Sequence, residues 1–197
     1  MEPKRLMVIK DPEVAKLLGD ELRRNILHLV TLREMSAADI VKELDKNYSS
    51  VVYHVKLLEE AGLVKKVREE VIQNKIQAYY RASAYYFHVS YYLEEAMMND
   101  EEYSAWQEDL YNRLLNGLSS YNLMVPDEKR QRAKELLKVL YIEQKKEFEE
   151  RMEKRCAGVQ LDPSIAHSIE HIIANVQLLQ DKKHREAAEE LAKLLGL

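Results

Sequence analysis

The sequence predicts a mainly α-helical protein with one small β-hairpin, in two parts that span residues 1–83 and 84–197. Two short segments before Gly62 carry apolar residues at helical spacing, which is typical of amphipathic helices. After Gly62 the pattern changes to the alternation that favours strands. No proline occurs between Pro12 and Pro126, so the chain beyond the hairpin can form long helices. These observations predict two helices, a hairpin and then a helical region.

The most informative helix is expected at Asn47–Ala61. Asn47 can act as its N-cap, and Gly62 can adopt the left-handed conformation that ends a helix. Apolar side chains recur on one face at Val51, Val55 and Leu58. The opposite face contains no acid and consists of Ser49, Ser50, Val52, Tyr53 and Lys56. Such a face suits DNA, because carboxylates would repel phosphates whereas Ser, Tyr and Lys can reach bases or backbone.

A shorter helix is expected to precede it. The segment Ser36-Ala-Ala-Asp39 has the form of a capping box, with Asp in the place usually taken by Glu. It opens an apolar run through Ile40, Val41 and Leu44. The link Asp45–Asn47 is short enough for a helix-turn-helix.

The β-hairpin, or wing, is expected to have strands at Leu63–Ile72 and Lys75–Arg81, with a turn at Gln73-Asn74. Strict alternation places Lys66 and Arg68 on one face of the wing and Lys65 on the other. One set can then face phosphates. Glu69 and Glu70 argue against deep insertion of the wing into a groove. Helix, turn, helix and hairpin is the order of a winged helix-turn-helix.

Three segments in this order and spacing resemble ArsR-type winged-helix transcription regulators: Leu22–Leu27, Tyr53–Val64 and Tyr79–Arg81. The resemblance is strong over residues 11–82. The helical remainder is similar to archaeal members with a long C-terminal extension, of the heat-shock-regulator kind. The resemblance implies a DNA-binding domain at 1–83 and a helical dimerisation or regulatory region at 84–197. It also implies that Arg23 and Arg24 approach the DNA backbone; a solvated basic pair is the alternative.

The overall charge of −4 conceals an uneven distribution. Residues 1–82 hold 15 Lys and Arg against 13 Asp and Glu, whereas residues 83–197 hold 15 against 21. Residues 46–82 alone hold 7 against 4, so the positive excess coincides with the expected DNA-binding segment. The excess is modest, which favours dimeric binding. The absence of a secretion signal or membrane span, together with a single cysteine, Cys156, leads us to expect a cytoplasmic protein without disulfides.

Candidate catalytic and metal-binding patterns are weak. His167-Ser-Ile-Glu-His171 has the spacing of an inverted zinc-peptidase motif, but no third ligand is evident. The helix at Ser36–Leu44 lacks the cysteines with which many ArsR-type proteins sense metals. We therefore expect no enzyme activity, no metal and no cofactor. Aromatic residues are dense between 79 and 111, which predicts either packing against the helices or a pocket for an effector.

Further helices are expected after Asp11-Pro12 and Asp20, over 100–121, from Pro126 to Gly158, from Asp162-Pro163, and over Lys182–Leu195. His28 is expected at the boundary of the core, and His54 is expected to be a hydrogen-bonded structural residue.

The sequence therefore predicts a transcription regulator that binds double-stranded DNA as a homodimer and has no membrane partner. Repression by occlusion of a promoter is what the resemblance implies. The expected DNA-contacting residues lie in the second helix and the wing: Tyr48, Ser49, Ser50, Val52, Tyr53, Lys56, Lys66, Arg68 and Lys75. The alternative is a winged-helix adaptor that binds a protein through the same face.

Overall fold

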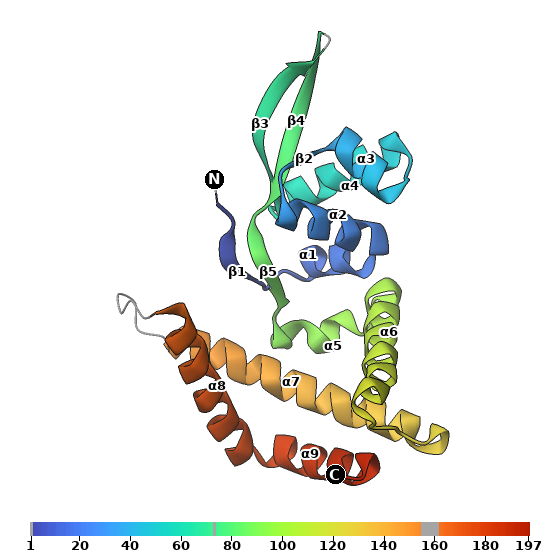
Figure 1. Ribbon diagram of the computed structural model, residues 1–197, viewed down its shortest axis with the longest axis vertical. Coiled ribbons are helices and arrows are strands. Elements are labelled where there is room, and N and C mark those ends of the chain that lie inside the picture. Colours follow the sequence, from blue (N-terminus) through green and yellow to red (C-terminus); the bar gives the residue numbers. More distant parts are fainter. Residues whose placement is uncertain (1, 73, 155–161) are drawn as a thin grey trace. The chain divides into compact units, whose positions relative to one another are not determined.

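The computed structural model describes residues 2–72, 74–154 and 162–197 (Figure 1). Within it the chain forms two compact units, Met1–Trp106 and Gln107–Leu197. This division falls later than the boundary between residues 83 and 84 that the sequence suggests. The reason is that Val89, Met97 and Tyr103 are buried in the core of the first unit. The segment after the wing therefore completes this unit.

The first unit contains short helices around the wing. Its elements are β1 (Lys4–Ile9), α1 (Pro12–Lys16), a 3₁₀ turn (Leu17–Gly19), α2 (Glu21–Leu32), β2 (Met35–Ser36), α3 (Ala37–Leu44), α4 (Tyr48–Glu60), β3 (Val64–Ile72), β4 (Lys75–Ala82), β5 (Ala84–Val89), a 3₁₀ turn (Tyr91–Leu93), α5 (Glu94–Met97) and the start of α6 (Glu101–Gly117). The sequence-predicted helices and wing are all present. The fold class, a winged helix-turn-helix followed by a helical region, is confirmed.

Side-chain caps mark the beginning of α1, α2, α3 and α4. The carboxylates of Asp11 and Asp20 accept hydrogen bonds from the amides of Glu13 and Arg23. Ser36 and Asp39 form the expected capping box, in which each side chain accepts from the other residue's backbone amide. Hydrogen bonds from Ser36 lower the pKa of the Asp39 carboxyl. The ionised form that the cap requires is therefore retained at neutral pH.

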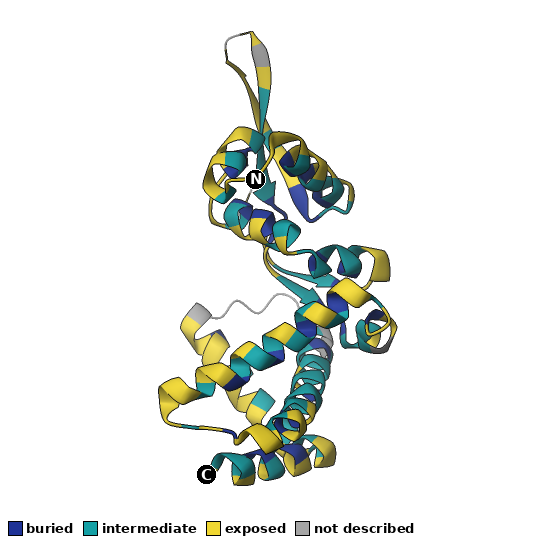
Figure 2. Ribbon diagram, turned by 90° about the vertical axis from the view of Figure 1, so that its right-hand side faces the viewer, coloured by how far each residue is buried: buried dark blue, intermediate teal, exposed yellow. Residues whose placement is uncertain are grey.

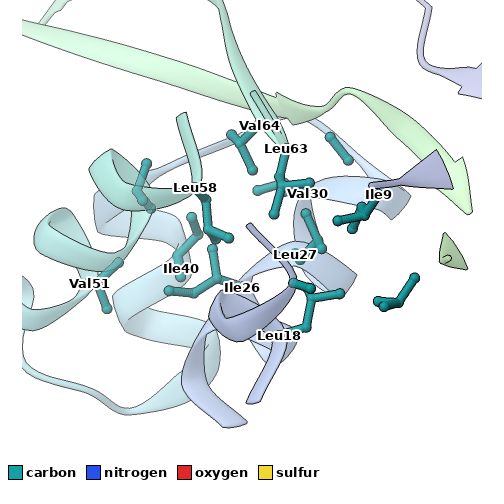
Figure 3. Close-up of a cluster of buried hydrophobic side chains, with 14 of the residues drawn as sticks. Ile9, Leu18, Ile26, Leu27, Val30, Ile40, Val51, Leu58, Leu63 and Val64 are labelled. Carbon is teal, nitrogen blue, oxygen red and sulfur yellow. The ribbon is translucent and has the colours of Figure 1, made fainter. Parts of the chain in front are cut away.

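The core of the first unit brings α2, α3, α4 and the base of the wing together (Figure 3). Ile26 and Val30 of α2, Ile40 of α3 and Leu58 of α4 are all fully buried. These residues recur at the helical spacing that the sequence shows, so a single apolar stripe on each helix forms the support behind α4.

Two sheets accompany the helices in the described part of the chain. One has the strand order β2-β4-β3 and is antiparallel, and the other is a parallel pairing of β1 with β5. Residues Lys4–Ile9 form a strand because they pair with β5.

The second unit consists mainly of helices: the rest of α6, α7 (Arg130–Lys154), α8 (Pro163–Gln180) and α9 (Lys182–Leu195). Its core contains Leu115, Val125, Leu136 and Leu191. The expectation that Pro126 opens α7 is wrong, because a 3₁₀ turn over Asp127–Lys129 intervenes. The expected end of α7 at Gly158 lies outside the described residues. No described helix is both long and apolar enough to cross a membrane.

Candidate nucleic-acid interface

Helix α4 presents the face from Ser49 to Lys56, which contains no acid, to the exterior of its unit, and Glu60 follows one turn after Lys56. Val51, Val55 and Leu58 are buried, as the apolar spacing predicts. On the other side Tyr48 is 59% exposed, Tyr53 is 58% exposed and Val52 is 40% exposed. Ser49 and Lys56 are exposed as well, and Ser50 is partly exposed (Figure 2). The thirteen residues of α4 give a helix about 20 Å long, which can lie in a DNA major groove about 12 Å wide.

The turn before α4 is built from side chains that fix the direction of the helix. Asp45 ends α3 in the left-handed conformation, with φ of 49°. Lys46 then donates its amide to the Val41 carbonyl at 3.4 Å. The Asn47 side chain accepts from the Ser49 amide at 2.9 Å and also from the Ser49 hydroxyl. Ser49 is thus held at the exposed N-terminal end of α4.

Two of the three lysines predicted to contact DNA, Lys56 and Lys66, already have carboxylate partners. Lys56 Nζ lies 3.6 Å from Glu60 Oε1, and Lys66 Nζ lies 2.6 Å from Glu69 Oε1. The hydrogen bond and charge of Glu69 raise the pKa of Lys66. Both pairs are exposed, and exposed ion pairs contribute little to stability. A phosphate can therefore replace either carboxylate at small cost.

A β-bulge changes the faces of the wing. Lys66 lies opposite Tyr80, whereas Arg68 lies opposite Tyr79, because the register shifts between the two residues. Directly opposed residues share a face, and Tyr79 and Tyr80 face opposite ways. The expectation that Lys66 and Arg68 share one face is therefore wrong. Lys66 lies on the Tyr80 face.

Arg68 instead shares its face with Lys65, which lies opposite Arg81. Its guanidinium lies 3.5 Å from the centre of the Tyr79 ring and forms ion pairs with Glu34, at 2.9 Å, and with Glu70. The Tyr79 hydroxyl donates to Glu70 at 3.0 Å. Arg68 thus joins both wing strands to the segment before β2. Whether it also contacts phosphate stays a prediction. Lys75 opens β4, and its side chain is outside what the structure describes.

The loss of Arg68 is expected to loosen the wing. In Arg68→Ala, amides of β3 and β4 beyond the bulge should exchange with solvent several-fold faster, since both the ring contact and the ion pairs disappear. Hydrogen–deuterium exchange measures this directly. Arg113→Ala is the control, because Arg113 pairs with Asp109, one turn away on α6, and among the described residues no other ion pair of Arg113 is found. Unchanged exchange in the wing would show that Arg68 does not hold it.

The interpretation of Arg23 and Arg24 as a solvated basic pair is wrong, and their approach to the DNA backbone stays a prediction. Arg23 is mostly buried, and its guanidinium donates to the Leu17 carbonyl and pairs with Glu102 at 3.3 Å. Arg24 donates to the Leu18 and Gly19 carbonyls and stacks 4.9 Å from the centre of the Trp106 ring. Both arginines therefore satisfy carbonyls at the end of the 3₁₀ turn. They are structural residues.

The two histidines near the predicted interface also differ from expectation. His28 is exposed and does not lie at the boundary of the core. His54 is partly buried and packs edge-on against Tyr53, with ring centres 5.3 Å apart. Its Nδ1 is buried and has no hydrogen-bond partner among the described residues, so the expected hydrogen-bonded role is wrong. Periodicity places a side chain on a face but does not supply its partner.

Lys42, Lys46 and Arg81 were not among the cations that the sequence analysis considered, and Lys65 was considered only as the cation on the second face of the wing. Within the described ranges none of them forms an ion pair within 4 Å, in contrast to Lys56, Lys66 and Arg68. Lys46 directly precedes the cap of α4, and that position in the sequence could have indicated it. Lys65 and Arg81 are like charges on opposed strands, an arrangement that a bound anion would stabilise.

The other candidates from the sequence are the pair His167 and His171, Cys156 and the aromatic segment. The rings of His167 and His171 lie 5.1 Å apart on α8. No group of three or more potential ligands for a metal ion is found in the described part of the chain. Cys156 lies outside it. Of the aromatic segment, Tyr103 is buried and Trp106 packs edge-on against it, whereas Tyr86 and Tyr92 are exposed.

Comparison with protein families agrees with this geometry. A family model described as a helix-turn-helix domain matches residues 18–67, which comprise α2, α3, α4 and the start of β3. Residues 18–67 form a helix-turn-helix domain. Domains of this kind are found in DNA-binding regulators, and the match supports that broad class for this chain. No curated protein matches the chain. In this helix-turn-helix domain α4 occupies the position of the DNA-reading helix.

Proposed function

We propose that the protein is a transcription regulator that binds specific double-stranded DNA as a homodimer and represses by occupying a promoter. The observation that carries the proposal is the exposed face of α4 from Ser49 to Lys56, which contains no acid and lies on a buried three-helix support. The resemblance to ArsR-type regulators supports the same role. The small charge excess of the first 82 residues supports dimeric binding, since two copies double the number of phosphate contacts.

In the proposed complex α4 lies in the major groove. Ser49, Ser50 and Tyr53 are suited to hydrogen bonds with base edges or phosphates, while Val52 offers an apolar contact to thymine methyl groups. Tyr48 lies beside the groove edge. Phosphates are contacted by Lys56, Lys66 and Lys75. Lys46, which precedes the helix cap, makes an additional phosphate contact. A two-fold dimer would read half-sites about 34 Å apart.

Selection of bound duplexes from random DNA tests the specificity of the protein, and salt titration tests the contacts. Wild-type protein is expected to enrich a palindrome. Lys56→Ala should weaken binding and reduce the salt slope by about 0.9, because one counterion fewer is released. Lys182→Ala is a matched control. Lys182 lies 3.7 Å from Glu186 in the same i,i+4 arrangement that joins Lys56 to Glu60, but it lies on α9.

An equal slope for wild type and Lys56→Ala would remove Lys56 from the interface. A complete lack of duplex binding at low salt would count against the regulator and favour the adaptor. In that case the α4 face would have to bind a protein.

A further inference from the structure

Helix α8 exposes most of its large aliphatic residues, and the only described residue of α8 that is buried is the small Ala166. Ile165 is 52% exposed, Ile172 is 63% exposed and Leu179 is 66% exposed. Ile169 and Ile173 are each 40% exposed, and Val176 is 52% exposed. On the side that faces its own unit α8 has Ala166, which is buried, and the partly buried Glu170 and Gln177. This distribution is the reverse of that expected for a helix whose outer face meets water. Figure 2 shows the exposed residues along α8.

The exposed residues follow a coiled-coil spacing. We define the α8 seam as Ile165, Ile169, Ile172, Val176 and Leu179, which are separated by four, three, four and three residues. This is the alternation of a and d positions in a heptad repeat, in which apolar side chains of one helix fit between those of another. The seam spans about 21 Å of helix. Its occupant is therefore expected to be another helix with matching spacing.

The near absence of charged residues in α8 indicates that the partner helix is α8 of a second copy. Glu170 is the one Asp, Glu, Lys or Arg in α8, and neither it nor His167 and His171 belongs to the seam. By contrast α7 and α9 are rich in Lys and Glu. A partner protein other than a second copy is normally selected by charged residues beside the apolar contact that complement those of the partner. The α8 seam offers none, and two copies of it would meet without like-charge repulsion. Such a surface is self-complementary, as a two-fold interface requires.

From these observations we infer that the α8 seam is the surface through which two copies of this chain associate. The inference deepens the proposed function, because it assigns the interface of the homodimer on which that function rests. Helix α8 already packs against α7 and α9, so little ordering is needed on association. The dimer should form without DNA.

Light scattering at several protein concentrations, without DNA, tests the assignment. Wild-type protein is expected to be a dimer. Ile172→Glu would bury a charge at the centre of the seam and should raise the dimer dissociation constant by at least about 100-fold, as loss of a central contact does. Met124→Glu is the control, because Met124 is 77% exposed in the same unit but lies outside α8. It should remain a dimer. Circular dichroism establishes that both variants stay folded.

A monomeric wild-type protein would overturn the inference, as would an Ile172→Glu variant that stays dimeric. If Ile172→Glu loses helical structure, Ile172→Ala replaces it and should raise the dissociation constant without a new charge; no change would again overturn the inference. Failure of the proposed function gives a result that differs from failure of the dimer assignment. It would appear as a wild-type dimer dissociated by Ile172→Glu that binds no duplex at low salt.

Discussion

Ser49→Glu is expected to lower duplex affinity at least about 100-fold while leaving the fold intact. Ser49 is exposed in the first turn of α4, next to the Asn47 cap. A carboxylate there would face phosphates, and a like-charge contact at an interface costs several kcal/mol. The same carboxylate suits the helix, because α4 has no acid in its first turn and negative charge near a helix N-terminus is stabilising. Binding and stability should thus change in opposite directions.

The matched control is Ser164→Glu. Ser164 occupies the same position in α8 as Ser49 does in α4, two residues after the cap, and its amide and hydroxyl bond to Asp162. Affinity is measured by fluorescence anisotropy on a selected duplex, and stability by thermal unfolding. Ser164→Glu should bind as wild type. If Ser49→Glu also binds as wild type, α4 does not face the DNA.

Leu58→Ala is expected to lower the free energy of unfolding of the first unit by about 2–5 kcal/mol. Leu58 is fully buried in the core behind α4, where its removal leaves a cavity (Figure 3). Typical domains are stable by only about 5–15 kcal/mol. The variant should therefore lose DNA binding at moderate temperature, although Leu58 does not lie on the exposed face. The loss should be reversed on cooling toward the temperature of maximum stability.

The single tryptophan, Trp106, makes the unfolding free energy of the first unit measurable, because it packs against Tyr103 in the core of this unit. Urea unfolding followed by tryptophan fluorescence then reports on this unit. Leu32→Ala is the control. Leu32 is 64% exposed at the end of α2, and its truncation should change stability by less than about 0.5 kcal/mol. Equal midpoints for Leu58→Ala and wild type would contradict the core described above.

Much of the first unit follows from local signals. The capping box of Ser36 and Asp39, the Asn47 cap and the left-handed Gly62 give the limits of α3 and α4 within a residue. The face of α4 that is buried follows from apolar spacing. These features depend on hydrogen bonds and side chains a few residues apart, so the sequence contains the information directly.

The interaction partners of the charged residues could not be predicted from such local sequence signals. Alternation placed Lys66 and Arg68 together, but a bulge separates them. Arg23 and Arg24 look like a basic surface pair in the sequence, yet they bond to carbonyls of the preceding turn. In each case the deciding contact depends on strand register or on the path of the chain, which composition does not encode.

For this protein, the order of elements, the helix ends and the acid-free face of α4 are already present in the linear pattern of residues. Three-dimensional packing decided which cations are held by carboxylates, where the first unit ends, and that the aliphatic side of α8 faces outward. The reason is physical. Capping and periodicity act over one or two helical turns, whereas burial and ion pairing are set by segments that meet only after the chain has folded.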